Sequence, residues 1–157
     1  MTGNKRILRI CLASVIALVI ELSGGSAIAA NAGHVDDSLY RALGGKAGIT
    51  AIVETTLNKI ADDTRIVHYF AGANIAHVHH GLITIFCVVS GGPCTYTGEN
   101  MVDTHRGLHV TAAAFNAMVE DLQAAMAQLQ IPLGAQNRLL ARLAKMRNQI
   151  VEPAQRD

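Results

Sequence analysis

The sequence predicts an all-α protein with a single domain. Several stretches repeat apolar residues every three or four positions, a spacing that places them on one face of a helix. Alternating β-branched runs bounded by tight turns, which indicate strands, are almost absent. Glycine, proline and aspartate clusters separate the periodic stretches and mark the ends of helices. The length of 157 residues also leaves room for only one core.

The first half of the predicted domain contains two helices of medium length. A short turn over 38–43 and Gly44-Gly45 precede a helix over 47–61. The cluster Asp62-Asp63-Thr64 is expected to cap a short helix that ends at Tyr69-Phe70. A further helix over 75–89 ends at the breaker Ser90-Gly91-Gly92-Pro93.

The second half begins with a glycine-bearing loop and ends with two long helices. A brief helical stretch is expected over 101–106. Thr111 caps a helix over 112–129, and Pro132-Leu133-Gly134 separates it from a last helix over 135–151. Periodicity alone is equally compatible with a plain helical bundle.

Residues 1–29 have the pattern of a secretory signal peptide. Lys5, Arg6 and Arg9 form a basic start, 10–20 is an unbroken apolar run, and Ala27-Ile28-Ala29 supplies a small-x-small cleavage pattern. The run of eleven residues is too short for a bilayer core of about 30 Å. We therefore expect secretion into the periplasm and no membrane attachment after cleavage; an uncleaved N-terminal anchor is the alternative. The expected organisation is a signal peptide over 1–29, a tail over 30–37, a domain over 38–152 and a tail over 153–157.

The composition excludes several classes of protein. Aromatic residues are 4% of the chain and Trp is absent, which argues against an RNA-stacking platform or an aromatic carbohydrate groove. The formal charge of +1 gives no electrostatic footprint for nucleic acid. With 50% hydrophobic residues, the chain is too apolar to be disordered.

The histidines and cysteines are the candidates for binding a cofactor or forming a disulfide. The spacing of the seven histidines does not fit a zinc site, and no C-x-x-C-H motif attaches haem covalently. His105 follows the glycine-bearing loop and Met101 by one turn, which makes it the best candidate for an axial ligand of a non-covalent cofactor. A capping or solvated histidine is the alternative. For Cys87 and Cys94, a short-loop disulfide and a buried free thiol at Cys87 both stay open.

An ordered series of motifs resembles the group I truncated haemoglobins from Ser38 to about Val151. The motifs are Leu39-Tyr40 before Gly44-Gly45, Asp62-Asp63, Tyr69-Phe70, Asn74, Phe86, Gly91-Gly92-Pro93, Tyr96-Thr97-Gly98, and Met101-x-x-x-His105 followed by Gly107 and Thr111. Each motif is weak by itself, but the ordered series is specific. The resemblance implies a globin sandwich of two helices over two, with one non-covalent haem b between them.

The resemblance also implies roles for individual residues. His105 matches the proximal ligand of the haem iron, and Phe70 matches an aromatic residue that packs on the porphyrin. Met101 and Tyr96 match positions on the proximal side. The remaining expected haem contacts are Leu57, Ile75, Val78, Leu82 and Phe86. For Phe70, Met101 and Tyr96 ordinary core packing is the alternative role, and both roles can hold together because a porphyrin is part of the core.

The expected distal side differs from many members of the family. Leu57 stands where they place a tyrosine, and Val78 and Leu82 stand at their two usual polar positions. We therefore expect an apolar distal pocket. The histidines His77, His79 and His80 are expected at the haem edge or in solvent, with His79 as a candidate sixth ligand of the iron.

These expectations favour a haem protein that reversibly binds O₂, NO or CO, for oxygen transport or for the handling of NO. A bis-histidine haem protein for electron transfer or redox sensing is the alternative. A third possibility is NO dioxygenation as a side activity, which needs a reductase partner. The last is a degenerate globin that no longer binds haem.

Overall fold

The computed structural model describes residues 36–153, and all regular elements in that range are helical. The expected signal peptide over 1–29 lies outside the described residues, as do 30–35 and 154–157. No helix among the described residues combines the length and apolar character needed to cross a membrane. The elements follow in this order: α1 (Ser38–Ala42), α2 (Gly45–Asp62), the 3₁₀ helix η1 (Val67–Phe70), α3 (Ile75–Val89), α4 (Met101–Thr104), α5 (Ala112–Gln128), α6 (Leu133–Leu143), the 3₁₀ helix η2 (Ala144–Met146) and α7 (Arg147–Ile150).

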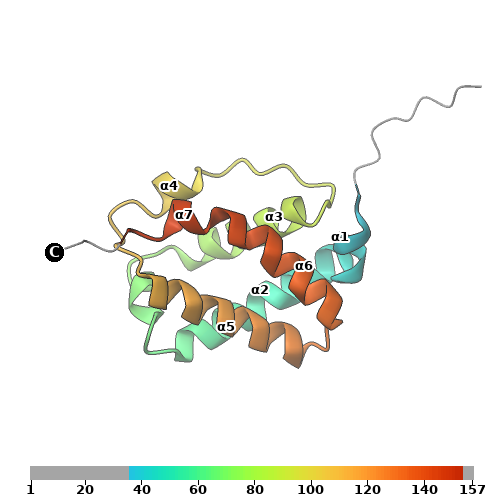
Figure 1. The fold of residues 1–157 in the computed structure, drawn as a ribbon, viewed down its shortest axis with the longest axis horizontal. Coiled ribbons are helices and arrows are strands. Elements are labelled where there is room, and N and C mark those ends of the chain that lie inside the picture. Colours follow the sequence, from blue (N-terminus) through green and yellow to red (C-terminus); the bar gives the residue numbers. More distant parts are fainter. Residues whose placement is uncertain (1–35, 154–157) are drawn as a thin grey trace, which may run out of the picture. The chain divides into compact units, whose positions relative to one another are not determined.

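Four helices build the body of the domain (Figure 1). The helix α2 packs against both α3 and α5, and α6 packs against the same two helices. This closes a square of contacts, so the all-α sandwich of two helices over two is confirmed. The short α4 packs against α7, at the far end of the loop that leaves α3.

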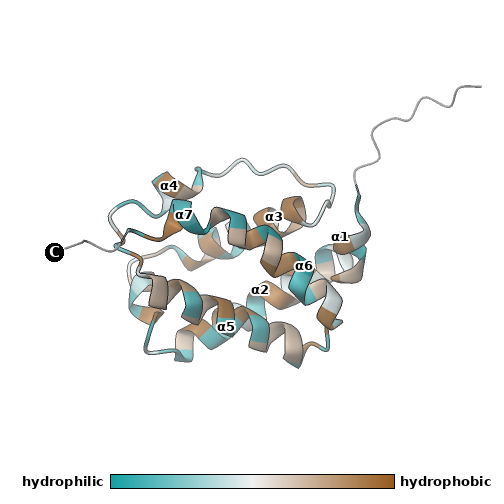
Figure 2. Cartoon of the chain, viewed as in Figure 1, coloured by the Kyte–Doolittle hydropathy of each residue, from teal (hydrophilic) through white to brown (hydrophobic). Residues whose placement is uncertain are grey.

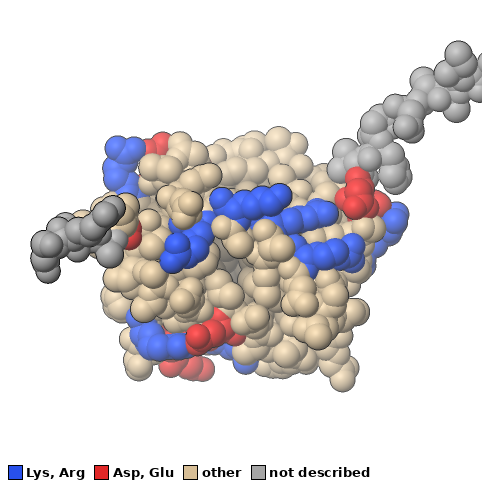
Figure 3. All heavy atoms as spheres, viewed as in Figure 1, with Lys and Arg blue, Asp and Glu red and all other residues tan. Residues whose placement is uncertain are grey.

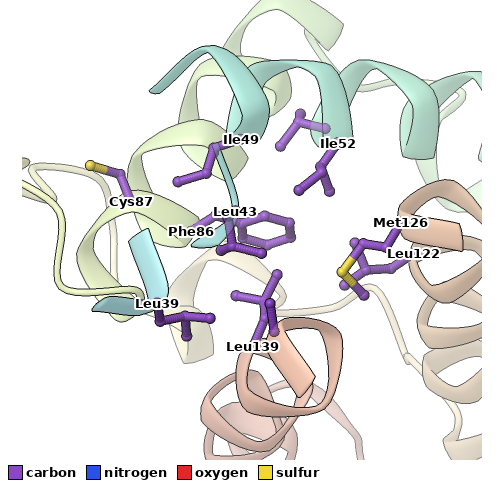
Figure 4. Close-up of a cluster of buried hydrophobic side chains, with 11 residues drawn as sticks. Leu39, Leu43, Ile49, Ile52, Phe86, Cys87, Leu122, Met126 and Leu139 are labelled. Carbon is purple, nitrogen blue, oxygen red and sulfur yellow. The ribbon is translucent and has the colours of Figure 1, made fainter. Parts of the chain in front are cut away.

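The main core fills the space between these helices (Figure 4). Each helix supplies apolar residues at the helical spacing read from the sequence, as with Ile49, Ile52 and Val53 of α2. The buried members are Leu39, Leu43, Ile49, Ile52, Val53, Phe86, Cys87, Leu122, Met126, Ala135 and Leu139. A second cluster lies where the end of α2 meets α5, with Ile60, Ile66, Val110, Ala114 and Ala117.

Two glycines allow the helices to approach closely. A Cβ at Gly48 in α2 would collide with the carbonyl oxygen of Leu43. A Cβ at Gly92 would lie 2.5 Å from the Tyr40 ring and 2.6 Å from the Cys87 sulfur. The Gly91-Gly92 breaker therefore ends α3 and also fits that end against α1.

Several helix boundaries differ from the sequence prediction, and α2 begins two residues earlier than expected, at Gly45. Asp62 and Asp63 end α2 instead of capping the next helix, because Asp63 adopts an extended backbone and its carboxylate accepts the backbone N–H of Arg65 at 2.8 Å. The last helix begins earlier, at Leu133, and tightens into a 3₁₀ turn at Ala144. The helix before His105 is shorter than expected and ends at Thr104.

The last helical stretch is rich in basic residues. It contains Arg138, Arg142, Lys145 and Arg147, and Figure 3 shows a band of Lys and Arg along α6 and α7. Two of these cations hold neighbouring helices. Arg142 Nη1 donates to the carbonyl of Val89 at 2.6 Å, and Arg138 Nη1 donates to the Ser38 hydroxyl at 3.2 Å. They therefore fix α6 to the end of α3 and to α1.

Candidate cofactor site

The local structure around His105 fixes the orientation of its ring. Asn100 caps α4, accepting the N–H of Asp103, and His105 follows as the C-terminal cap. The Nδ1 atom of the half-buried ring lies 2.9 Å from the carbonyl oxygen of Met101. Because a carbonyl only accepts, Nδ1 must carry the proton, which leaves the lone pair on Nε2. In metal sites, a hydrogen bond from the ring nitrogen that does not bind the metal orients a ligating histidine.

The helix α3 carries a long apolar face that the main core covers only in part. Val78, Leu82 and Ile85 are only half-buried, and the side chain of Ile75 is 49% exposed. These positions recur at three- and four-residue steps and so share one helical face. Figure 2 shows that much of α3 is strongly hydrophobic. Apolar surface left half-open in this way suits a large, flat, apolar group.

A cavity of about 400 Å³ lies beside this face, between α2, η1 and the start of α3. Leu57, Phe70 and Ile75, three of the expected haem contacts, line it. Asn58 and His68 add two polar groups that sequence reasoning did not assign to this place. The only available signal for His68 was its position directly before the Tyr69-Phe70 motif.

The residues present fit a haem. The unprotonated Nε2 of His105 suits iron, and the half-open aliphatic surface of α3 suits a porphyrin face. Met101, the first residue of α4, and Tyr96, in the preceding loop, are both half-buried, and the Tyr96 hydroxyl donates to the carbonyl of Glu99 at 2.9 Å.

Phe86 occupies a different place from the other expected contacts. Its side chain is 3% exposed and belongs to the main core, against α1, α2, α5 and α6 (Figure 4). Phe86 as a haem contact stays a prediction.

The histidines of α3 lie toward α2 or solvent. His79 Nε2 lies 3.6 Å from the Glu54 carboxylate of α2, so this ring faces the neighbouring helix. His77 and His80 are exposed. His79 as a sixth ligand stays a prediction.

Cys87 and Cys94 form a disulfide, which decides between the two alternatives left by the sequence. Cys87 is fully buried in α3 and Cys94 is half-buried in the following loop. The turn at Gly91-Gly92 returns the chain, so that the two Cα atoms lie 5.9 Å apart.

A second depression, of about 570 Å³, lies between the end of α2 and α5 and has a charged lining. Arg65 bridges Asp63 and Glu120 there, at 2.7 and 2.6 Å. Hydrogen bonds from Arg65 hold the pKa of Asp63 below its ordinary value. Burial raises the pKa of Asp121, and repulsion by Asp63 adds to the effect. This lining suits water and ions and does not suit a porphyrin.

Comparisons with known proteins agree with this geometry. The sequence model of the bacterial-like globin family matches residues 38–152. A group 1 truncated haemoglobin of Tetrahymena thermophila is 29% identical over 109 residues, which are 69% of this chain and 87% of the relative. One from a Nostoc species is 29% identical over 114 residues, 73% of this chain and 97% of the relative. The solved Fe(III) form of the Tetrahymena pyriformis truncated haemoglobin superimposes with a TM-score of 0.71 at 25% identity, covering 73% of this chain and 98% of that one.

Proposed function

The chain belongs to the bacterial-like globin family, and from this premise we propose that it is an exported globin whose apolar pocket favours NO and CO over O₂. As a truncated haemoglobin, it holds one non-covalent haem and binds diatomic gases. The finer proposal concerns which gas it handles and where.

The proximal half of the function rests on His105. We propose that its Nε2 ligates the iron, while Nδ1 donates to Met101 and holds the ring in place. We propose further that Met101 and Tyr96, both half-buried, contact the haem on its proximal side, and that Phe70, which lines the cavity, packs on the porphyrin. Haem, when bound, supplies the iron centre that takes the gas.

The observation that carries the ligand preference is the aliphatic character of Leu57, Val78 and Leu82. Leu57 is half-buried, contacts both core clusters and lines the cavity. None of these three side chains can donate a hydrogen bond. In a dry pocket, a donor to the partly negative O₂ is worth about 1–3 kcal/mol, or roughly tenfold to a hundredfold in affinity. NO and CO depend less on such a donor, so this pocket favours them relative to O₂.

Two features of the chain support export. The first 29 residues carry the signal-peptide pattern, and the disulfide is a bond that persists in oxidising compartments. An exported globin that holds O₂ weakly is better suited to intercepting or sensing NO than to storing oxygen. If it also converts NO, a reductase partner must supply the electrons.

The first test is the absorption spectrum of the purified protein, ferric and dithionite-reduced. A five-coordinate, high-spin ferrous spectrum supports gas binding at an open iron, whereas split, sharp low-spin bands support the bis-histidine alternative. The control His105→Ala is expected to lose stoichiometric haem, and added imidazole is expected to restore it. An unchanged spectrum in this variant contradicts the proximal assignment.

The second test concerns location. Expression of the full chain, followed by fractionation and mass measurement, is expected to yield a periplasmic product that begins near Ala30. A full-length product in the membrane fraction supports the anchor, and a full-length cytoplasmic product contradicts export.

A further inference from the structure

The segment that carries His105 is attached to the domain at its two ends. Among the described residues, every hydrogen bond and ion pair made by residues 95–108 joins two residues of that same segment. The helix α4 has only four residues, so it has little stability of its own. Its packing against α7 is the main contact between the segment and another helix. We call residues 95–108 the proximal segment.

The C-terminal end of the proximal segment is held by hydrogen bonds. The N–H of Glu152 donates to the carbonyl of Val110 at 3.0 Å, and the Glu152 carboxylate lies 3.0 Å from His109 Nδ1. Tyr69 adds a long hydrogen bond of 3.5 Å to the carbonyl of His109. These contacts join the chain just beyond the segment to η1 and to Glu152, the second residue after α7.

The N-terminal end of the proximal segment is held by the disulfide. Cys94 immediately precedes the segment, and its partner Cys87 is a fully buried residue of the main core (Figure 4). Backbone hydrogen bonds from Gly92 to Cys87 (2.8 Å) and from Cys94 to Gly92 (2.9 Å) follow the same turn. The bridge therefore connects the loop covalently to the rigid part of the domain.

The disulfide shortens the free connection between α3 and α4. Residues 90–100 join these helices without regular structure and form the long loop at the top of Figure 1. Because the bridge fixes Cys94, only residues 95–100 remain as a free connection before Met101. A shorter loop loses less conformational entropy when both of its ends are held in position. The bridge thus lowers the entropy cost of placing α4, and with it His105, against α7.

On this basis we propose that the Cys87–Cys94 disulfide is a positioning element for His105, and that it slows the loss of haem from the protein. The proposal rests on the proposed function of His105 as the iron ligand. The disulfide acts through the loop and touches neither iron nor gas. It goes beyond a contribution to global stability, because its effect is concentrated on the proximal segment.

The experiment compares the disulfide variant Cys94→Ser with a control of similar global stability. Met126→Ala removes a fully buried side chain from α5, in the main core and away from the proximal segment, and so lowers the stability of the whole domain. Haem transfer from the ferric full chain to an excess of a scavenger apoglobin gives the rate of haem loss. Cys94→Ser is expected to lose haem about tenfold faster than the parent, which corresponds to ~1.4 kcal/mol.

A second readout needs no haem. Hydrogen exchange of the amides of residues 95–108 in the full chain is expected to accelerate in Cys94→Ser and to stay unchanged in Met126→Ala. The unsubstituted chain reduced with dithiothreitol should behave like Cys94→Ser; there the two cysteines gain two electrons and two protons, and the dithiol becomes its cyclic disulfide. This arm covers the case in which Cys94→Ser folds poorly.

Two results would overturn the proposal. One is equal haem loss from Cys94→Ser and the parent, and the other is equal acceleration of haem loss or amide exchange by Met126→Ala. If the chain takes up no haem, the proposed function fails, while hydrogen exchange still decides whether the disulfide orders the proximal segment.

Discussion

A hydrogen-bond donor placed at position 57 should convert the pocket into one that retains O₂. Leu57 is half-buried and forms part of the wall of the 400 Å³ cavity, so a larger ring at this position has space beside it. Substitution of Leu57 by Tyr introduces a hydroxyl at the position where many truncated haemoglobins carry a tyrosine. The family resemblance assigns this position to the side of the haem on which the gas binds.

The expected size of the effect follows from the hydrogen bond gained. A donor to a partly charged acceptor in a water-poor site is worth about 1–3 kcal/mol. At 1.4 kcal/mol per factor of ten, O₂ should leave Leu57→Tyr roughly tenfold to a hundredfold more slowly than the parent. The affinity for CO should change much less, because CO accepts hydrogen bonds weakly.

The assay is stopped-flow displacement of O₂ by CO, with equilibrium CO binding measured on the same protein. Leu57→Phe is the matched control, because it brings the ring without the hydroxyl. The reasoning is refuted if Leu57→Phe slows O₂ release as much as Leu57→Tyr, or if neither variant changes it. The first outcome assigns the effect to the filled cavity, and the second shows that position 57 does not face the gas.

Three further predictions concern stability. Loss of the disulfide in Cys94→Ser, which opens a loop of eight residues, should lower the free energy of unfolding by about 2.5 kcal/mol and Tm by about 10 °C, as measured by calorimetry. Burial raises the pKa of the Asp121 carboxyl in the folded state. The carboxyl therefore favours folding while it is protonated, below its pKa in the unfolded chain, and this stabilisation is lost as the pH rises through its pKa in the folded protein. Asp121→Asn should therefore be more stable than the parent in urea at pH 7, by less than about 1 kcal/mol at this partly solvated site, and the difference should vanish near pH 3. Gly48→Ala should lower the free energy of unfolding by about 1–3 kcal/mol, because its Cβ collides with the Leu43 carbonyl. Gly134→Ala, which has open space around it in α6, should be neutral or stabilising by up to about 1 kcal/mol. Thermal melts in which Gly134→Ala is the less stable variant would contradict this expectation.

The amino-acid sequence by itself determined the helical architecture. Ile49, Ile52 and Val53 recur at the spacing that buries one side of α2, and Thr111 caps α5 in the structure as expected. Such features depend on neighbours within a few positions, so a linear pattern contains them. The resemblance to truncated haemoglobins likewise needed only the order of the motifs, and the family match has confirmed it.

Residue types also determined part of the candidate site. His105, at the end of a short helix after Met101, was identifiable as a ligand candidate. The aliphatic side chains at positions 57, 78 and 82 cannot donate hydrogen bonds, whatever the fold. The tertiary structure added the hydrogen bond from Nδ1 to the Met101 carbonyl, which leaves the lone pair on Nε2.

Only the tertiary structure decided the features that depend on distant contacts. The direction of His79 is set by how α3 crosses α2, which places its ring beside Glu54, and a helical wheel of α3 alone contains no such information. Phe86 lies in the main core because four other elements meet there. The disulfide required the turn at Gly91-Gly92 to return Cys94 to Cys87, since a covalent bridge depends on the separation of two atoms in space and not on their separation along the chain.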